Sequence, residues 1–133
     1  MAALRAGVIG LGAMGRPHAR VLREIDGVDL VAVADPGGDP YGVSGDLDVL
    51  PDVDALIAAG IQKAVVPVPT VFRGAGALAR AAAGVHTLVE TPIAATSEAG
   101  RKVAQAFAEA GLVGAVGLIE RFTPALQALR RRT

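Results

Sequence analysis

Short apolar runs rich in valine, isoleucine and alanine alternate along this chain with alanine-rich segments whose apolar positions recur every three or four residues. The apolar runs are typical of strands buried on both faces, and the segments between them are typical of amphipathic helices. This alternation predicts a doubly wound α/β fold, in which a mostly parallel sheet of about six strands carries helices on both faces.

The expected boundaries follow from the glycine and proline residues that interrupt the pattern. We expect strands over residues 5–9, 28–34, 62–66, 86–89 and 112–118. We expect helices over residues 13–25, 51–59, 72–83 and 97–110, and a last helix from Pro124 that ends in Arg130, Arg131 and Arg132. Residues 36–45 contain too many glycines and prolines for a crossover helix, so we expect an abbreviated unit around the third strand.

Composition narrows the classes of protein to consider. A chain of 133 residues that is 52% hydrophobic is long enough to bury the core of one domain. Basic and acidic residues both number 13, so no net charge attracts nucleic acid. With no cysteine and two histidines, we expect no metal site. No basic leader and no long apolar run is seen, so we expect a cytoplasmic protein without membrane contact.

The segment after the first predicted strand fits the pattern G-x-G-x-x-G and opens the first predicted helix. Its members are Gly10, Leu11, Gly12, Ala13, Met14 and Gly15. Gly10 permits the sharp turn, Gly12 lets a diphosphate approach the backbone, and Gly15 lets the helix pack closely on the strand. The free amides and the dipole at the helix start then bind the diphosphate, with Arg16 as a second contact. Because the strand and helix context is present, we reject the alternative of a turn that binds nothing.

Asp35 ends the second predicted strand, at the distance after the glycine-rich turn that dinucleotide-binding domains use for an acidic residue. A carboxylate there accepts hydrogen bonds from both hydroxyls of the adenosine ribose and repels a ribose phosphate. Asp35 therefore favours NAD over NADP as the cofactor. An aspartate before Pro36 is also a common turn-forming residue, and the residues alone leave that alternative open.

Three further segments follow the glycine-rich turn in a characteristic order, namely VAVADP (31–36), VPVPT (66–70) and LVETP (88–92). With these segments the chain resembles the Gfo/Idh/MocA oxidoreductase family over nearly its whole length. The resemblance implies NAD(P)-dependent oxidation of a CH–OH group in a sugar or polyol. It also places Pro67, Val68, Pro69 and Glu90 beside the cofactor. From the residues alone, the two prolines are explained equally well as the end of a buried strand.

The chain departs from this family at the residues expected to face the reaction. The family's Glu-Lys-Pro motif reads Glu-Thr-Pro here, and Thr91 has no group that exchanges a proton near neutral pH. Arg73 and Thr123 stand where relatives commonly carry histidine and asparagine. His18 and His86 have no carboxylate at a spacing that suggests a catalytic pair, so we expect both to be structural. We therefore assign no catalytic residue.

Two functions stay open at this point. Residues 1–120 are predicted to form a Rossmann dinucleotide-binding domain, and residues 121–133 a junction toward the second, substrate-binding domain that the resemblance implies. The chain is then either the cofactor half of an oxidoreductase, inactive alone, or a non-catalytic dinucleotide-binding or dimerisation module. The apolar stretch 113–118 would lie uncovered without a second domain, so we expect a homodimer.

Overall fold

A computed structural model describes residues 1–131, with the backbone alone at residues 71 and 72, so Arg132 and Thr133 of the predicted junction lie outside the described residues. Six parallel strands form one sheet in the order β3-β2-β1-β4-β5-β6. The strands are β1 (Leu4–Ile9), β2 (Val28–Ala34), β3 (Val49–Leu50), β4 (Lys63–Val66), β5 (His86–Val89) and β6 (Gly114–Val116). The predicted fold class and strand number are confirmed.

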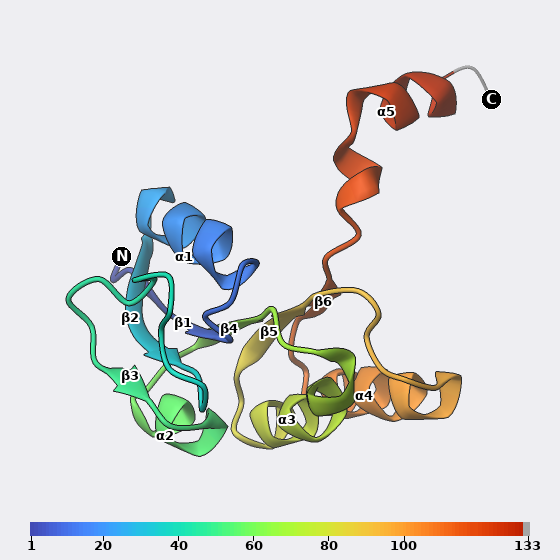
Figure 1. Ribbon diagram of the computed structural model, residues 1–133. Coiled ribbons are helices and arrows are strands. Elements are labelled where there is room, and N and C mark those ends of the chain that lie inside the picture. The colour runs from blue at the N-terminus through green and yellow to red at the C-terminus, as the bar shows by residue number, and fades with distance from the viewer. Residues whose placement is uncertain (132–133) are drawn as a thin grey trace.

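Helices cover both faces of this sheet, as predicted. They are α1 (Gly15–Glu24), α2 (Val53–Ala58), α3 (Thr70–Ala82), α4 (Ser97–Glu109) and α5 (Pro124–Arg130), with a 3-10 turn η1 (Ile119–Phe122) before the last. In Figure 1, α1 lies on one side of the sheet, while α2, α3 and α4 lie on the other. The segment from η1 through α5 extends away from this layered body.

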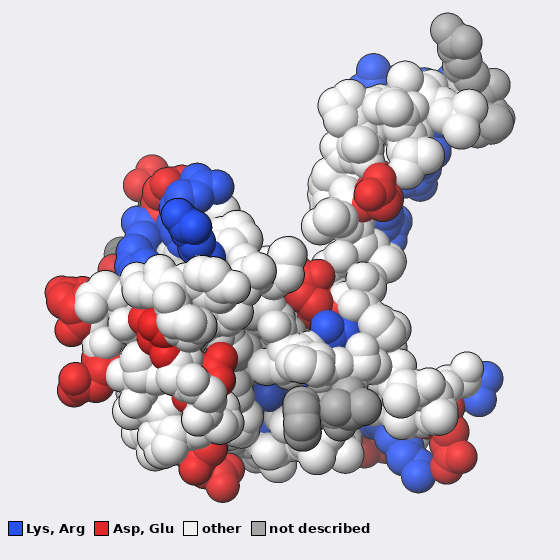
Figure 2. Space-filling model, viewed as in Figure 1, with Lys and Arg blue, Asp and Glu red and all other residues white. Residues whose placement is uncertain are grey.

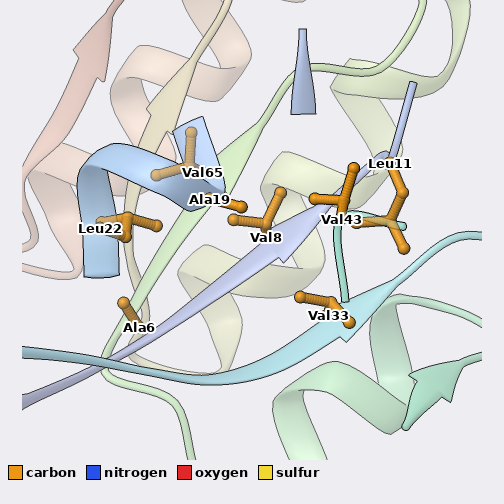
Figure 3. Packing of buried hydrophobic residues seen from close by; sticks show 8 residues of the cluster. All are labelled: Ala6, Val8, Leu11, Ala19, Leu22, Val33, Val43 and Val65. Carbon is orange, nitrogen blue, oxygen red and sulfur yellow. The ribbon is translucent and has the colours of Figure 1, made fainter. Parts of the chain in front are cut away.

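Alternation along β1 explains how the two faces are filled. Ala6 and Val8 belong to the core cluster under α1, whereas Ile9 belongs to the cluster under α2. Figure 3 shows the first cluster, in which Val8 lies among side chains of β2, β4 and α1. Val43 completes this cluster from the loop after β2.

Residues 36–48 form no helix, as the density of glycine and proline predicts. Asp39 folds this loop by accepting hydrogen bonds from the Ser44 hydroxyl at 2.6 Å and from the N–H groups of Val43 and Ser44 at 2.8 Å. The bond from the Ser44 hydroxyl holds the pKa of Asp39 below its usual value. Arg23 of α1 donates to the carbonyls of Val43 and Ser44 at 2.9 Å. The loop thereby covers the sheet where a crossover helix would otherwise lie.

Helices α1, α2 and α3 and strand β6 each begin two residues away from their predicted starts. Helix α1 begins at Gly15 instead of residue 13, because residues 11–14 still belong to the turn that starts at Gly10. Strand β6 covers residues 114–116 instead of 112–118. Leu112 does not join the strand, because its N–H donates to the carbonyl of Phe107 at the end of α4. Leu118 does not join it either, because its N–H donates to the carbonyl of Val116 in a turn.

Helix α3 contains a buried arginine. Arg80 is 1% exposed, and its Nε and Nη2 atoms have no hydrogen-bond partner among the described residues. Gly76 makes room for the side chain, since a Cβ there would lie 2.9 Å from Nη1 of Arg80. Burial lowers the pKa of Arg80 to about 10, because removal from water disfavours the charged form.

Arg80→Met is expected to raise the free energy of unfolding by about 1–3 kcal/mol, since it removes buried donors that lack acceptors and keeps the apolar stem. The penalty belongs to the protonated guanidinium, so it is fully present at pH 7 and declines as pH rises through about 10. Urea unfolding at pH 7 measures the change. The exposed Arg101→Met is the control and should shift stability by no more than about 0.5 kcal/mol. A less stable Arg80→Met protein would contradict this account.

Candidate dinucleotide site

Two glycines allow α1 to start directly against the end of β1. Gly10 has a φ of +102°, and a Cβ on it would lie 2.9 Å from Cγ1 of Val68. A Cβ on Gly15 would lie only 2.1 Å from the carbonyl oxygen of Gly10. No larger residue fits at Gly15 without moving the backbone, so the helix start is fixed close to the strand end.

The turn between these glycines presents open backbone donors. The N–H groups of Gly15 and Arg16 donate to the carbonyl of Gly12 at 3.0 and 3.4 Å. Those of Gly12, Ala13 and Met14 donate to no acceptor within residues 1–131. Apart from its chain neighbours, no described atom lies within 4 Å of a Cβ built on Gly12, so the backbone there is open to close approach. An anion such as a diphosphate can therefore approach the N–H groups closely.

Capping distinguishes α1 from two other helices of the sheet. Asp52 caps α2 and Thr96 caps α4, each accepting from the N–H three residues further on. The Ncap of α1 is Met14, whose side chain cannot accept such a bond, and the first turn contains no acidic residue. The positive end of the α1 dipole is thus left to an external anion.

Asp35 lies beside this turn and is bonded to it. Its Oδ2 accepts the Leu11 N–H at 2.8 Å, and its Oδ1 accepts the Gly37 N–H at 2.7 Å. Each carboxylate oxygen keeps a further lone pair for an incoming hydroxyl. The side chain of Leu11 is fully buried, and the Leu11 N–H donates to Asp35. Leu11 therefore holds the carboxylate in place.

The loop after β4 forms the other side of the turn. Pro67 and Val68 lie against Gly10, with the Pro67 carbonyl 3.1 Å from the Gly10 Cβ position, while Pro69 is the Ncap of α3. Arg73, which is 7% exposed, donates from Nε to the Val68 carbonyl and from Nη1 to the Pro92 carbonyl, both at 2.6 Å. Arg73 therefore joins the loop after β4 to the loop after β5.

His18 has an acidic partner that the sequence spacing does not suggest. Its Nε2 lies 2.6 Å from Oε1 of Glu90, which follows β5. The partners are 72 positions apart in the sequence, so no local spacing signals the pair. The neighbouring Thr91 is exposed. His86 does have the expected structural contact, because its Nδ1 accepts the Val113 N–H at 3.0 Å.

An apolar surface lies apart from this site, at the β6 edge of the sheet. A groove of about 320 Å³ runs between α4 and the last two strands and is lined by residues that include Val103, Phe107 and Val116. Val113, which lies between two residues that line the groove, is 65% exposed. Among the described residues, no helix is long and apolar enough to cross a membrane, and no three His, Asp or Glu side chains gather as metal ligands.

The strand order reverses between β1 and β4, and the open amides follow β1 at this point, next to the carboxylate after β2. These features together define a Rossmann-type dinucleotide-binding domain. Over residues 4–118 the chain matches the Gfo/Idh/MocA family, described as an oxidoreductase family with an NAD-binding Rossmann fold. The chain belongs to this family.

Characterised relatives resemble the chain over nearly all of its length. It is 35% identical over 131 residues to UDP-N-acetylglucosamine 3-dehydrogenase of Acidithiobacillus ferrooxidans, covering 96% of the chain and 41% of that enzyme. It is 29% identical over 135 residues to scyllo-inositol 2-dehydrogenase (NAD(+)) of Bacillus subtilis, covering 97% and 40%. The chain thus spans about two fifths of the length of these relatives.

Solved structures agree with this assignment. The scyllo-inositol dehydrogenase of Lactobacillus casei with bound NAD(H) and scyllo-inositol superposes with a TM-score of 0.86, at 23% identity, over 97% of this chain and 40% of that one. The UDP-N-acetylglucosamine 3-dehydrogenase of A. ferrooxidans superposes with a TM-score of 0.83, at 33% identity, over 99% and 44%. The first of these likenesses supports the fold alone.

Two alanine substitutions separate binding from folding in the turn. Gly12→Ala places a methyl group in open space, so we expect unchanged stability and NADH binding weakened by about tenfold or more. Gly15→Ala places a methyl group against the Gly10 carbonyl, so we expect about 2 kcal/mol or more of destabilisation. Thermal unfolding and fluorescence titration measure the two effects. Equal behaviour of the two variants would contradict the geometry described.

Proposed function

We propose that this chain is the NAD-binding half of an oxidoreductase that acts on a sugar or polyol CH–OH group and lacks a catalytic base of its own. The observation that carries the proposal is the row of open N–H groups at Gly12, Ala13 and Met14 beside the carboxylate of Asp35. This arrangement offers donors to a diphosphate and acceptors to a ribose within one crevice.

The residues present fit NAD along the whole crevice. The open amides and Arg16 would hold the diphosphate, and Asp35 would accept from the hydroxyls of the adenosine ribose. Pro67, Val68 and Pro69 would form the wall beside the cofactor, and Glu90 would lie near its nicotinamide half. Bound NAD supplies the hydride acceptor for alcohol oxidation, while the protein's part is to bind and orient it.

The charge around Asp35 supports NAD over NADP. Between residues 36 and 50 the chain has three aspartates and neither lysine nor arginine. Figure 2 shows acidic atoms gathered at the side of this loop and α2, whereas basic atoms gather over α1. Arg23 of α1 contacts the far part of the loop, where its Nη2 donates to the Val43 and Ser44 carbonyls. A ribose phosphate at Asp35 would therefore meet negative charge, with neither lysine nor arginine in the loop to pair with it.

Catalysis by the chain alone is not expected. Thr91 stands at the position of the family's lysine and cannot exchange a proton near neutral pH. The crevice at the strand ends is open, and a second domain or polypeptide would be needed to exclude water from it. We infer that residues 1–120 are the cofactor domain and that residues 121–133 lead toward such a partner. The cytoplasmic location expected from the sequence stays a prediction.

Cofactor titration tests this function directly. We expect the chain to bind NADH at least tenfold more tightly than NADPH, a difference of about 1.4 kcal/mol in binding free energy. We expect no turnover of inositols or UDP-sugars with NAD. Asp35→Asn removes the charge but keeps an acceptor for the Leu11 N–H, so the preference for NADH should shrink by about tenfold. No binding of either nucleotide at about 1 mM would overturn the proposal.

A second candidate function, assembly with another copy, is favoured by the apolar surface at β6. Strand β6 lies at the edge of the sheet, and the exposed Val113 is flanked by two residues that line the groove along α4. A large exposed apolar area next to an edge strand is a common place for association. We propose that two copies of the chain pair through this surface.

Light scattering at micromolar concentration is expected to give the mass of a dimer for the natural sequence. Val113→Lys should yield a monomer, because it places a charge on the pairing surface. Val21→Lys is the matched control, since Val21 is also exposed but lies on α1, and it should leave the dimer intact. A monomeric natural protein would end this second proposal.

A further inference from the structure

The His18–Glu90 pair joins two parts of the chain at the crevice. His18 lies in the second turn of α1, just after the glycine-rich turn, and Glu90 directly follows β5. The atoms Nε2 and Oε1 are 2.6 Å apart, and the side chains are 22% and 14% exposed. A short contact of this kind between half-buried groups is a strong hydrogen bond, so it fixes both side chains.

The carboxylate of Glu90 is confined from a second side as well. A Cβ on Gly117, just beyond β6, would lie 3.2 Å from Oε2 of Glu90. Within the described part of the chain, the imidazole of His18 is the one side chain that bonds to Glu90. Without that imidazole, the carboxylate would be free to rotate toward solvent.

The sheet order places this pair away from the adenosine end. Asp35 follows β2, the open amides follow β1, and β4 separates β1 from β5. A dinucleotide with its adenosine ribose at Asp35 and its diphosphate at the turn extends its other half across the ends of β4 and β5. That half carries the nicotinamide, and Glu90 follows β5.

We propose that His18 is a positioning residue for the nicotinamide half of the bound cofactor. The imidazole holds the Glu90 carboxylate at the crevice, where that carboxylate accepts hydrogen bonds from the ribose hydroxyls or the carboxamide N–H groups of the nicotinamide half. The proposal rests on the proposed function, because it requires NAD to bind in the crevice. It predicts a role for His18 that is confined to one half of the ligand.

ADP-ribose separates the two halves, because it shares everything in NADH except the nicotinamide. His18→Ala is expected to weaken NADH binding by about tenfold and to leave ADP-ribose binding within about twofold of its original value. His18→Gln keeps an N–H donor for Glu90 and should restore most of the NADH affinity. Glu90→Ala removes the acceptor and should reproduce the selective loss. Calorimetry with both ligands measures all four proteins, and circular dichroism checks that each is folded.

His86→Ala is the matched control, since it removes the other histidine and should change neither affinity selectively. An equal loss of both ligands in His18→Ala would show a merely structural role and overturn the inference. Unchanged NADH binding in folded His18→Ala or Glu90→Ala protein would overturn it too. If the natural chain binds neither ligand, the proposed function fails and takes the inference with it, which is a distinct result.

Discussion

Helix α1 begins against the carbonyl of Gly10, and every other part of the site takes its place from that contact. Gly15 has no side chain, and a Cβ at this position would lie 2.1 Å from the carbonyl oxygen of Gly10. In the turn before the helix, the N–H groups of Gly12, Ala13 and Met14 have no acceptor among the described residues, and the backbone at Gly12 is open to close approach. The Leu11 N–H then reaches Asp35 and fixes the carboxylate beside those amides.

The two halves of the crevice differ in how complete they are. At the end that we propose for adenosine, the chain provides backbone donors, a carboxylate and a loop that contains neither lysine nor arginine. At the end that we propose for nicotinamide, the chain provides Glu90 with its imidazole partner, while Thr91 brings no titratable group. This asymmetry agrees with a chain that spans two fifths of the length of its relatives.

Local signals in the sequence were enough to predict the fold, the glycine-rich turn after β1 and the carboxylate that follows β2. The strand–turn–helix pattern around Gly10 and the acidic end of β2 depend on neighbours in the sequence, so one sequence displays them. The His18–Glu90 and Arg73–Pro92 contacts join segments 72 and 19 positions apart, and nothing in the spacing marks them. Arg80 was also missed, because helical periodicity does not exclude a long charged side chain from a buried position.

The central claim is that the amides around Gly12 form the anion site, with Asp35 at the ribose. Two-dimensional ¹H–¹⁵N NMR during titration with NADH tests it most directly, because it reports on individual N–H groups. The account predicts that the largest shifts fall on Gly12, Ala13 and Met14, with smaller ones at Leu11 and Gly37, whose N–H groups bond to Asp35. Shifts centred on the groove between α4 and β6, with the turn unaffected, would contradict it.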